Sequence, residues 1–365
     1  MKVVVLEVST ANHLVMLQNW IRISAVNNLD ITIFTNERCL SMLEKTDEYK
    51  YGRLSVKKIC KFNGDLISEI RSELGPAGRL VVNSIYTNFI FFIFLFATVK
   101  HAYFTIHNVN KWFFLTAKSG GIVRRLIRFI ILKAIFFLAS GVFVNSENMK
   151  KYMLSLGVKK RTCVLPFSLK MRPNLKCRNS TFTIVYPGVV SEKRKSYELF
   201  FMAAQRFPDI DFILLGTLGK EEINVISRID KTTCSNVKVF NSYVPVNVFD
   251  SYMSKCDLLF SDIKTKFDDE IYGLSKDSGV SYLMYEYCIP LLVNSEFKNT
   301  WNLHRVTSYF SNYEELCDYI HFFRGLSSLQ WRQKLERIDF ARKEISFDVV
   351  SKNIAGFIGV SDCGG

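Results

Sequence analysis

Residues 181–216, TFTIVYPGVVSEKRKSYELFFMAAQRFPDIDFILLG, contain the clearest indication of the fold class. A short apolar run at 183–186 is followed by Gly188, a basic loop and a longer stretch with helical spacing. A second apolar run follows at 211–215. Continuous apolar runs are typical of parallel strands that helices cover on both faces. The stretch therefore predicts a strand–helix–strand unit of a parallel sheet.

The same alternation recurs along the whole chain of 365 residues, a length that favours two domains. A polar, basic stretch at 170–181 contains a proline and is the expected linker. We therefore expect an α/β protein with two doubly wound parallel-sheet domains, 1–172 and 181–345, and a C-terminal helix and tail at 346–365. The stretch from about 329 to 358 reads as helical. The other candidate strands are residues 3–6, 31–34, 80–82, 102–106, 141–144, 237–239, 257–260 and 290–293.

Composition excludes several classes of protein. With 48% hydrophobic and 22% charged residues, the chain has too much apolar material for a wholly disordered protein. Its nine cysteines form no CxxC pair and lack zinc-site spacing, which favours a reducing compartment. The apolar start is too short for a signal peptide, and the uncharged run 89–99 is shorter than the ~20 residues of a spanning helix. We therefore expect a cytoplasmic protein.

The positive charge is concentrated in one third of the chain. The net charge is +14, and residues 74–191 hold 17 lysines and arginines against one carboxylate, Glu147. Such a field attracts anionic partners, namely a membrane surface, phosphorylated substrates or nucleic acid. Charge alone does not choose among them.

The first candidate site follows the strand at 183–186. Ligands of parallel sheets bind beyond the carboxyl ends of the strands, and here Gly188 permits close approach of a ligand to the backbone. Arg194 and Lys195, which we expect to be exposed, are placed to clamp a diphosphate. The alternative is a strand-to-helix turn with a solvated basic run.

The second candidate site is the stretch 272–281, YGLSKDSGVS, which opens a predicted helix. Small residues leave the first N–H groups of a helix available to an anion. Lys276 adds a full charge, and Ser278 and Gly279 form the turn itself. Capping of the helix by Asp277 or Ser278 is compatible with this role.

The third candidate site is the pair His107 and Asn108, at the end of the strand 102–106. A histidine there suits contact with a reacting sugar or phosphate. The alternative is a hydrogen-bonded histidine that holds the loop.

The fourth candidate is Tyr243, which follows the strand 237–239. Its ring is suited to stacking on a nucleobase, although an aromatic residue after a strand commonly packs in the core.

The order of short phrases along the chain resembles the GT-B fold glycosyltransferases, specifically the retaining family 4 and its relatives. The resemblance covers nearly the whole chain. It implies two Rossmann-like domains that face a central crevice, with a UDP- or GDP-type nucleotide-sugar on the second domain and the acceptor on the first. It also implies that no metal or other cofactor is needed. The phrases are residues 105–108, 144–150, 164–167, 186–188 with 194–195, 212–216, 256–259, 278–279 and 289–290.

The resemblance also implies roles for single residues. Arg194 and Lys195 match the family's cations on the donor diphosphate, and His107 matches the histidine near the transferred sugar. We add His13 and Glu286 to the candidate substrate-binding residues. No general base is identified.

The chain departs from the family at three positions. The family commonly has two glutamates where this chain has Ser275 and Leu283, and a glycine where it has Cys288. Glu286 lies three residues beyond Leu283, away from the family position.

The stretch 121–133, GIVRRLIRFIILK, predicts an amphipathic helix with Arg124, Arg125 and Arg128 on one side. We expect it to bind an anionic membrane, which places the protein on the inner face of the plasma membrane and favours a lipid-linked saccharide acceptor. The alternative is a helix packed on the first sheet with its arginines in solvent. The richness in Lys, Ile, Phe and Asn is typical of AT-rich bacteria, which makes a surface polysaccharide such as lipopolysaccharide the expected product.

Two other functions remain open. A nucleotide-sugar epimerase shares this two-domain architecture but has no need of a basic amphipathic surface. A non-enzymatic nucleic-acid-binding protein would use the same charge, yet the sequence contains no recognised DNA- or RNA-binding motif. We therefore expect no nucleic-acid partner.

Overall fold

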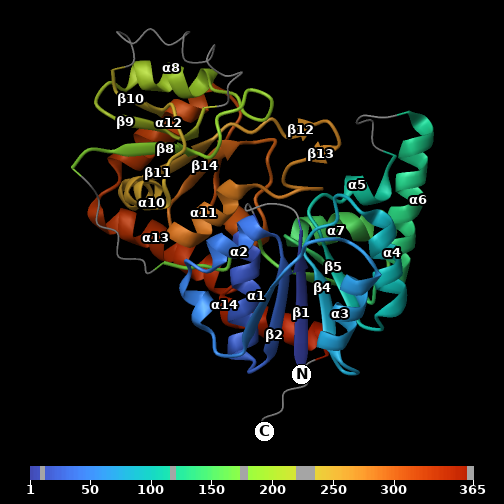
Figure 1. Cartoon of the computed structure of the whole chain (residues 1–365). Helices are drawn as coiled ribbons and strands as arrows, with labels where there is room; N and C mark the ends of the chain where they lie inside the picture. The colour runs from blue at the N-terminus through green and yellow to red at the C-terminus, as the bar shows by residue number, and fades with distance from the viewer. Residues whose placement is uncertain (9–12, 116–120, 173–179, 219–234, 360–365) are drawn as a thin grey trace. The chain divides into compact units, whose positions relative to one another are not determined.

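The computed structural model describes residues 1–8, 13–115, 121–172, 180–218 and 235–359, and the chain forms two compact units (Figure 1). Unit 1 comprises Met1–Leu169 and Phe347–Gly365, and unit 2 comprises Lys170–Ser346. The last helix, α14 (Phe347–Ile358), thus belongs to unit 1 although it follows all of unit 2 in sequence.

The sheet of unit 1 has seven parallel strands in the order β3-β2-β1-β4-β5-β6-β7. All five strands predicted here are confirmed. The two outer strands, β3 and β7, were missed because β3 is rich in lysine and only partly buried and β7 has three residues. The strands are β1 (Lys2–Glu7), β2 (Asp30–Thr35), β3 (Leu54–Lys58), β4 (Arg79–Val82), β5 (Ala102–Ile106), β6 (Gly141–Val144) and β7 (Thr162–Val164).

Helices cover both faces of this sheet. Because successive side chains of a strand point to opposite faces, Val4 and Leu6 of β1 join the core beneath α3, α4, α6 and α7, whereas Val3 and Val5 join the core beneath α1 and α14. The helices of unit 1 are α1 (Leu14–Val26), α2 (Glu37–Leu43), α3 (Gly64–Leu74), α4 (Phe89–Thr98), α5 (Asn110–Phe113), α6 (Ile122–Leu138), α7 (Glu147–Ser155) and α14, with a 3₁₀ turn, η2, at Asp47–Lys50.

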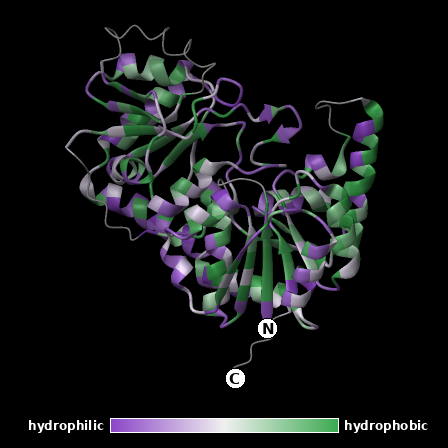
Figure 2. Ribbon diagram, in the orientation of Figure 1, coloured by the Kyte–Doolittle hydropathy of each residue, from purple (hydrophilic) through white to green (hydrophobic). Residues whose placement is uncertain are grey.

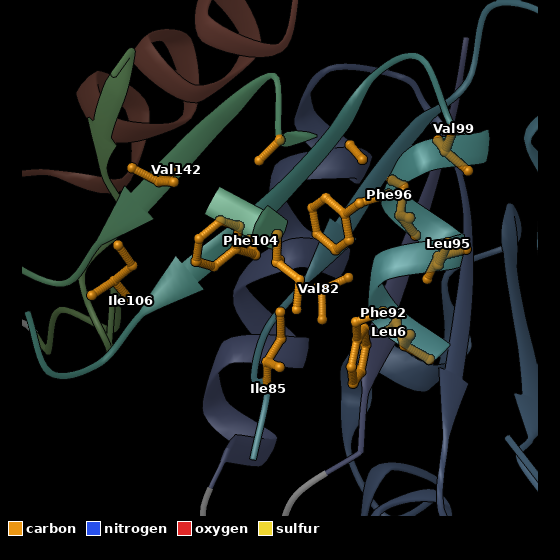
Figure 3. Packing of buried hydrophobic residues seen from close by; sticks show 14 of the residues in the cluster. Leu6, Val82, Ile85, Phe92, Leu95, Phe96, Val99, Phe104, Ile106 and Val142 are labelled. Carbon is orange, nitrogen blue, oxygen red and sulfur yellow. The ribbon is translucent and has the colours of Figure 1, made fainter. Parts of the chain in front are cut away.

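The inner face of α4 is part of the first of these cores, and Figure 3 shows it packed on the sheet. Phe92, Leu95 and Phe96 are buried. The ring of Phe96 lies edge-on to that of Phe104 in β5, with centroids 5.9 Å apart. Half of the apolar run 89–99 is therefore accounted for by the core of unit 1.

The sheet of unit 2 has six parallel strands in the order β10-β9-β8-β11-β14-β15. All five predicted strands are confirmed, whereas β15 and a short antiparallel hairpin, β12-β13, were missed. The strands are β8 (Thr183–Pro187), β9 (Asp211–Thr217), β10 (Val237–Phe240), β11 (Leu258–Ser261), β12 (Lys266–Phe267), β13 (Glu270–Ile271), β14 (Leu291–Asn294) and β15 (Ser308–Phe310).

The helices of unit 2 again lie on both faces of the sheet. The helical stretch expected over 329–358 is confirmed, and it forms two helices, α13 and α14, which belong to different units. The helices of unit 2 are α8 (Glu198–Arg206), α10 (Val246–Lys255), α11 (Gly279–Tyr287), α12 (Tyr313–Gly325) and α13 (Ser328–Lys343), with a 3₁₀ turn, η3, at Trp301–Arg305.

Each unit is thus a doubly wound α/β domain, as predicted. In each sheet the first strand of the unit lies in the interior, and the strand order reverses between β1 and β4 in unit 1 and between β8 and β11 in unit 2. Open parallel sheets bind their ligands beyond the carboxyl ends of the strands at such a point. Within the described ranges, no helix is long and apolar enough to cross a membrane.

Candidate functional sites

In unit 2, two glycines lie at the carboxyl ends of the neighbouring strands β8 and β9. Gly188, directly after β8, has a φ of +90°, a conformation that favours glycine. A Cβ at Gly216 of β9 would lie 2.1 Å from the carbonyl oxygen of Gly188, so these two backbones approach each other more closely than any side chain permits. The sequence signal at Gly188 therefore has a definite structural cause.

The basic loop after Gly188 places its two cations differently. Arg194 is exposed, as expected, but the exposure predicted for Lys195 is wrong. The turn that begins at Ser191 directs Lys195 back towards β8, where its Nζ donates to the carbonyl oxygen of Pro187 at 2.6 Å. Burial lowers the pKa of Lys195 to about 7. A bound anion at this position would favour its charged form.

A buried carboxylate that sequence reasoning missed draws two candidate cations together. Glu270 of β13 accepts hydrogen bonds from Lys276 Nζ at 2.7 Å and from the hydroxyl of Tyr272 at 3.0 Å. The guanidinium of Arg194 lies 3.7 Å from the same carboxylate. Burial alone would raise the pKa of Glu270, but Lys276 and Arg194 outweigh it and the pKa is lowered. We call Arg194, Glu270 and Lys276 the cation cluster.

The start of α11 lies next to this cluster in sequence and is capped as expected. Ser278 is the N-cap, and its hydroxyl accepts from Val280 N. Asp277 accepts from Ser278 N at 2.8 Å and from the hydroxyl of Tyr282 at 2.7 Å. Burial raises the pKa of Asp277 to about 6. A Cβ at Gly279 would meet no atom within 4 Å, so there is room beside the first turn of this helix.

The positions where family 4 has glutamates have structural roles in this chain. The buried hydroxyl of Ser275 accepts from Ile271 N at 2.8 Å and closes the turn after β13. Leu283 packs against the core of unit 2. The carboxylate next to the cations comes instead from Glu270, five residues earlier.

Two further predicted site residues of unit 2 are Tyr243 and Glu286. Tyr243 is 70% exposed in the loop before α10. Glu286 pairs with Arg172 Nε at 3.2 Å and with Lys170 Nζ at 3.5 Å, and it lies seven residues along α11 from Gly279, which is about 10 Å. The structure therefore places Glu286 in an ion-pair network with the first residues of unit 2.

In unit 1, His107 follows β5 and is held by two loops. Its Nε2 donates to the carbonyl oxygen of Asn83 at 2.7 Å, and its Nδ1 lies 3.0 Å from the side-chain oxygen of Asn145. Burial, together with the charge of His13, lowers the pKa of His107 to about 4, so its ring is neutral at pH 7. His107 therefore holds the loops that contain Asn83 and Asn145, which is the alternative given for it above. The same contacts fix the position of its ring.

His13 lies directly against His107. The two ring centroids are 4.6 Å apart, and Nδ1 of His13 lies 3.1 Å from Glu7 Oε2. Glu7 is fully buried at the end of β1, and its other oxygen accepts from the hydroxyl of Ser84 at 2.6 Å. The parallel sheet thus gathers Glu7, His13, Ser84 and His107, which we call the histidine cluster.

The remaining candidate of unit 1, Asn108, is buried, and its side chain accepts from Asn110 N at 3.0 Å. It therefore stabilises the turn into α5. In the part of the chain that the structure describes, no three His, Cys, Asp or Glu side chains are grouped so that they could hold a metal ion.

Helix α6 has its apolar side outward. At 100° per residue, the buried residues Leu132 and Ile135 lie on the same side of the helix as the three arginines. The opposite side is apolar and faces solvent, and Figure 2 shows much of α6 coloured as hydrophobic. We call this side the apolar face of α6; its members are Ile122, Val123, Leu126, Ile127, Ile130 and Phe137, each at least half exposed. The alternative, a helix packed on the first sheet with its arginines in solvent, is met in part: Leu132 and Ile135 join the core of unit 1, and Arg124 and Arg128 are exposed, but the apolar face is exposed as well.

Comparison with known proteins identifies the fold. No family model matches the chain, and no curated protein is significantly similar in sequence. Among solved structures, Anabaena Alr3699/HepE in complex with UDP has a TM-score of 0.68 at 12% identity, over 99% of this chain and 100% of that one. The N-terminal domain of Candida albicans trehalose-6-phosphate phosphatase has a TM-score of 0.65 at 11% identity, over 99% and 97%. A UDP-forming α,α-trehalose-phosphate synthase from Burkholderia vietnamiensis has a TM-score of 0.61 at 9% identity, over 98% and 99%. The chain therefore has the GT-B glycosyltransferase fold, as its sequence predicts.

Proposed function

We propose that the protein is a glycosyltransferase that moves a sugar from a UDP- or GDP-type nucleotide-sugar to a lipid-linked saccharide. The observation that carries the proposal is the cation cluster, at the carboxyl-end side of the sheet of unit 2, in a chain that shares its fold with structures in complex with UDP and with UDP-glucose. A pair of cations next to a capped helix start suits a diphosphate.

The donor diphosphate binds, in this proposal, to Arg194, Lys195 and Lys276. When the sugar leaves, negative charge develops on the diphosphate. Fixed cations and helix N–H groups stabilise that charge more in the transition state than in the ground state. Glu270 positions Arg194 and Lys276 before the ligand arrives, which reduces the reorganisation needed during the reaction. These cations supply charge that a metal supplies elsewhere, so we propose that activity needs no metal.

The acceptor, and the sugar during its transfer, contact the histidine cluster of unit 1. His107 is neutral and rigidly held by Asn83, so its ring offers the sugar a fixed, uncharged contact surface. His13 is oriented by the buried carboxylate of Glu7 and lies against His107. In line with the resemblance to family 4, we propose transfer with retention of configuration. Determining the anomeric form of the first product by NMR tests that part separately.

The membrane part of the proposal rests on α6. An apolar face that meets solvent, with arginines on the opposite side of the same helix, suits a helix that lies at an anionic lipid surface. We therefore propose that unit 1 binds the inner face of the plasma membrane, where a lipid-linked precursor of a bacterial surface polysaccharide is the acceptor.

A thermal-shift screen of the purified protein tests the donor assignment. UDP, GDP, CMP and dTDP conjugates are compared at equal concentration, because stabilisation by a ligand depends on its concentration relative to its dissociation constant. We expect a shift with one UDP-sugar or GDP-sugar. A shift with none of the four contradicts the proposal, and interconversion of the sugar without any acceptor supports the epimerase instead.

A further inference from the structure

An apolar pocket lies on the outer side of unit 1, between α3, α4 and α6. Its volume is about 730 Å³, within the usual range of about 300–1,000 Å³ for sites that bind one small ligand. The walls include Phe62, Ile67, Phe89, Phe94 and Ile131. The described residues that line it include no charged side chain. Such a pocket suits a hydrocarbon.

The pocket is lined by apolar residues of α4 that are not buried in the core of unit 1. The inner residues of α4 are buried against the sheet (Figure 3), but Ile90 and Phe94 are 65% and 59% exposed. Helix α4 packs against α6, and Ile131 of α6 follows directly after Ile130 of the apolar face. The pocket thus borders the face that we place on the membrane.

The chain also connects the pocket to the histidine cluster. Ser84 hydrogen-bonds Glu7, and the ring of Tyr86 lies 6.3 Å from that of His13. The pocket-lining residue Asn88 follows two positions later. A molecule with its head at the histidine cluster therefore has an apolar site a few residues away.

A positive charge lies beside the pocket, on a residue that contacts one of the lining residues. The guanidinium of Arg128 lies over the ring of Phe89, 5.3 Å from the ring centroid, and its side chain is exposed. A phosphate at the polar end of a hydrocarbon chain would find a partner there.

We propose that this pocket binds the single hydrocarbon chain of the lipid-linked acceptor and thereby orients the saccharide towards the histidine cluster. The inference rests on the proposed function, since it names the part of the acceptor that unit 1 recognises. A two-chain phospholipid is the alternative occupant, and the competition experiment below distinguishes it from a single chain.

Gly64 provides the means to test the pocket. It lines the pocket, and a Cβ at this position would meet no atom within 4 Å. Gly64→Trp therefore fills the pocket without a clash at Cβ, and Gly64→Leu fills it partly. Gly52 is equally open but is not among the residues that line the pocket, so Gly52→Trp is the matched control.

The probe is dodecyl phosphate, below its micelle concentration and without vesicles, measured by displacement of the fluorescent fatty acid cis-parinaric acid from the full-length protein. We expect one-to-one binding to the wild type and to Gly52→Trp. The affinity should fall at least tenfold in Gly64→Trp and less in Gly64→Leu. Dihexanoylphosphatidylglycerol should compete more weakly than dodecyl phosphate.

Binding to Gly64→Trp at the wild-type affinity would overturn the proposal, and so would an absence of binding to the wild type or preferential competition by the two-chain lipid. Circular dichroism shows whether each variant is folded. If Gly64→Trp does not fold, the smaller substitution Gly64→Leu still tests the proposal. The nucleotide screen is independent of this pocket, because unit 2 carries the cation cluster. If no nucleotide-sugar shifts the melting temperature but dodecyl phosphate binds the pocket, the result would contradict the proposed function and still support the pocket as a hydrocarbon-binding site.

Discussion

The carboxylate of Glu270 lies 2.7 Å from the ammonium of Lys276, and both side chains come from a short segment between β12 and α11. The Glu270 side chain is 4% exposed and that of Lys276 25%. Removing one partner of a buried pair leaves the other without its counter-charge, whereas removing both is much less harmful. The pair is therefore best examined with single and double variants.

We expect Glu270→Gln to destabilise the folded protein by about 2 kcal/mol, which is about 4–8 °C in the melting temperature of a domain of this size. The pKa of Glu270 is lowered in the folded state, so its stabilisation is present at pH 7 and is lost as the pH falls below about 4.3, the ordinary glutamate value. Melting curves at pH 7 and pH 4 measure both effects.

The double variant Glu270→Gln with Lys276→Met is the control, and it should be more stable than the sum of the two single changes predicts. Strict additivity at pH 7 would show that these two groups do not interact.

Lys195 predicts a pH dependence of nucleotide binding. Its pKa is about 7 in the protein without ligand, and an anion raises it, so binding takes up a proton above pH 7. The affinity for the nucleoside diphosphate should fall between pH 7 and pH 9, by at most tenfold per pH unit. Titration calorimetry at several pH values measures this, and Lys195→Met, of similar length but uncharged, should give weaker binding with a flatter profile. An equal slope in both proteins would remove Lys195 from the donor site.

His107→Ala should lower the turnover number and leave nucleotide affinity nearly unchanged, since the nucleotide belongs to unit 2 in our proposal. The pKa of His107 is about 4, so the ring stays neutral from pH 5 to pH 8 and its titration should produce no inflection of the rate in that range. Kinetics across this range test both statements, with His107→Gln as a variant that keeps a donor. A parallel loss of nucleotide affinity in His107→Ala would indicate a general loss of structure.

Membrane binding should depend on the two sides of α6 in different ways. Arg124→Glu, Arg125→Glu and Arg128→Glu together should abolish sedimentation with anionic vesicles, because attraction becomes repulsion within a Debye length of about 8 Å. Leu126→Ser with Ile130→Ser should weaken binding at high salt, where only apolar contacts persist. If the wild-type protein does not sediment with anionic vesicles at low salt, the proposed membrane binding and lipid-linked acceptor are wrong. The proposed nucleotide site would not be affected.

The strands and the fold class are predictable from the sequence because a parallel strand covered on both faces needs an unbroken apolar run. Strand β3, LSVKK, has no such run, since it lies at the edge of its sheet and is only partly buried. The capped start of α11 is equally local, because Ser278 and the residues it caps are neighbours in the chain.

The acids of the two clusters were not predictable in the same way. Glu7 and Glu270 are buried, yet in sequence each resembles an ordinary surface acid at the end of a strand. Their burial depends on partners brought by other elements, such as Ser84 after β4 for Glu7. The sequence of α6 predicts an apolar side and a side with arginines. Which of them faces solvent depends on the packing of Leu132 and Ile135, which the sequence does not reveal.

The proposed function depends most directly on binding of the donor diphosphate by the cation cluster. Titration calorimetry of the nucleoside diphosphate selected by the thermal-shift screen tests it, with wild type, Arg194→Ala, Lys276→Ala and the exposed unit 2 control Lys238→Ala.

We predict that Arg194→Ala and Lys276→Ala each weaken binding at least tenfold, and that turnover in Arg194→Ala and in Lys195→Ala falls by about 10², as expected for loss of about 2.7 kcal/mol of transition-state stabilisation. Lys238→Ala should match the wild type. Wild-type affinity in both cluster variants, with the proteins folded, would contradict the account.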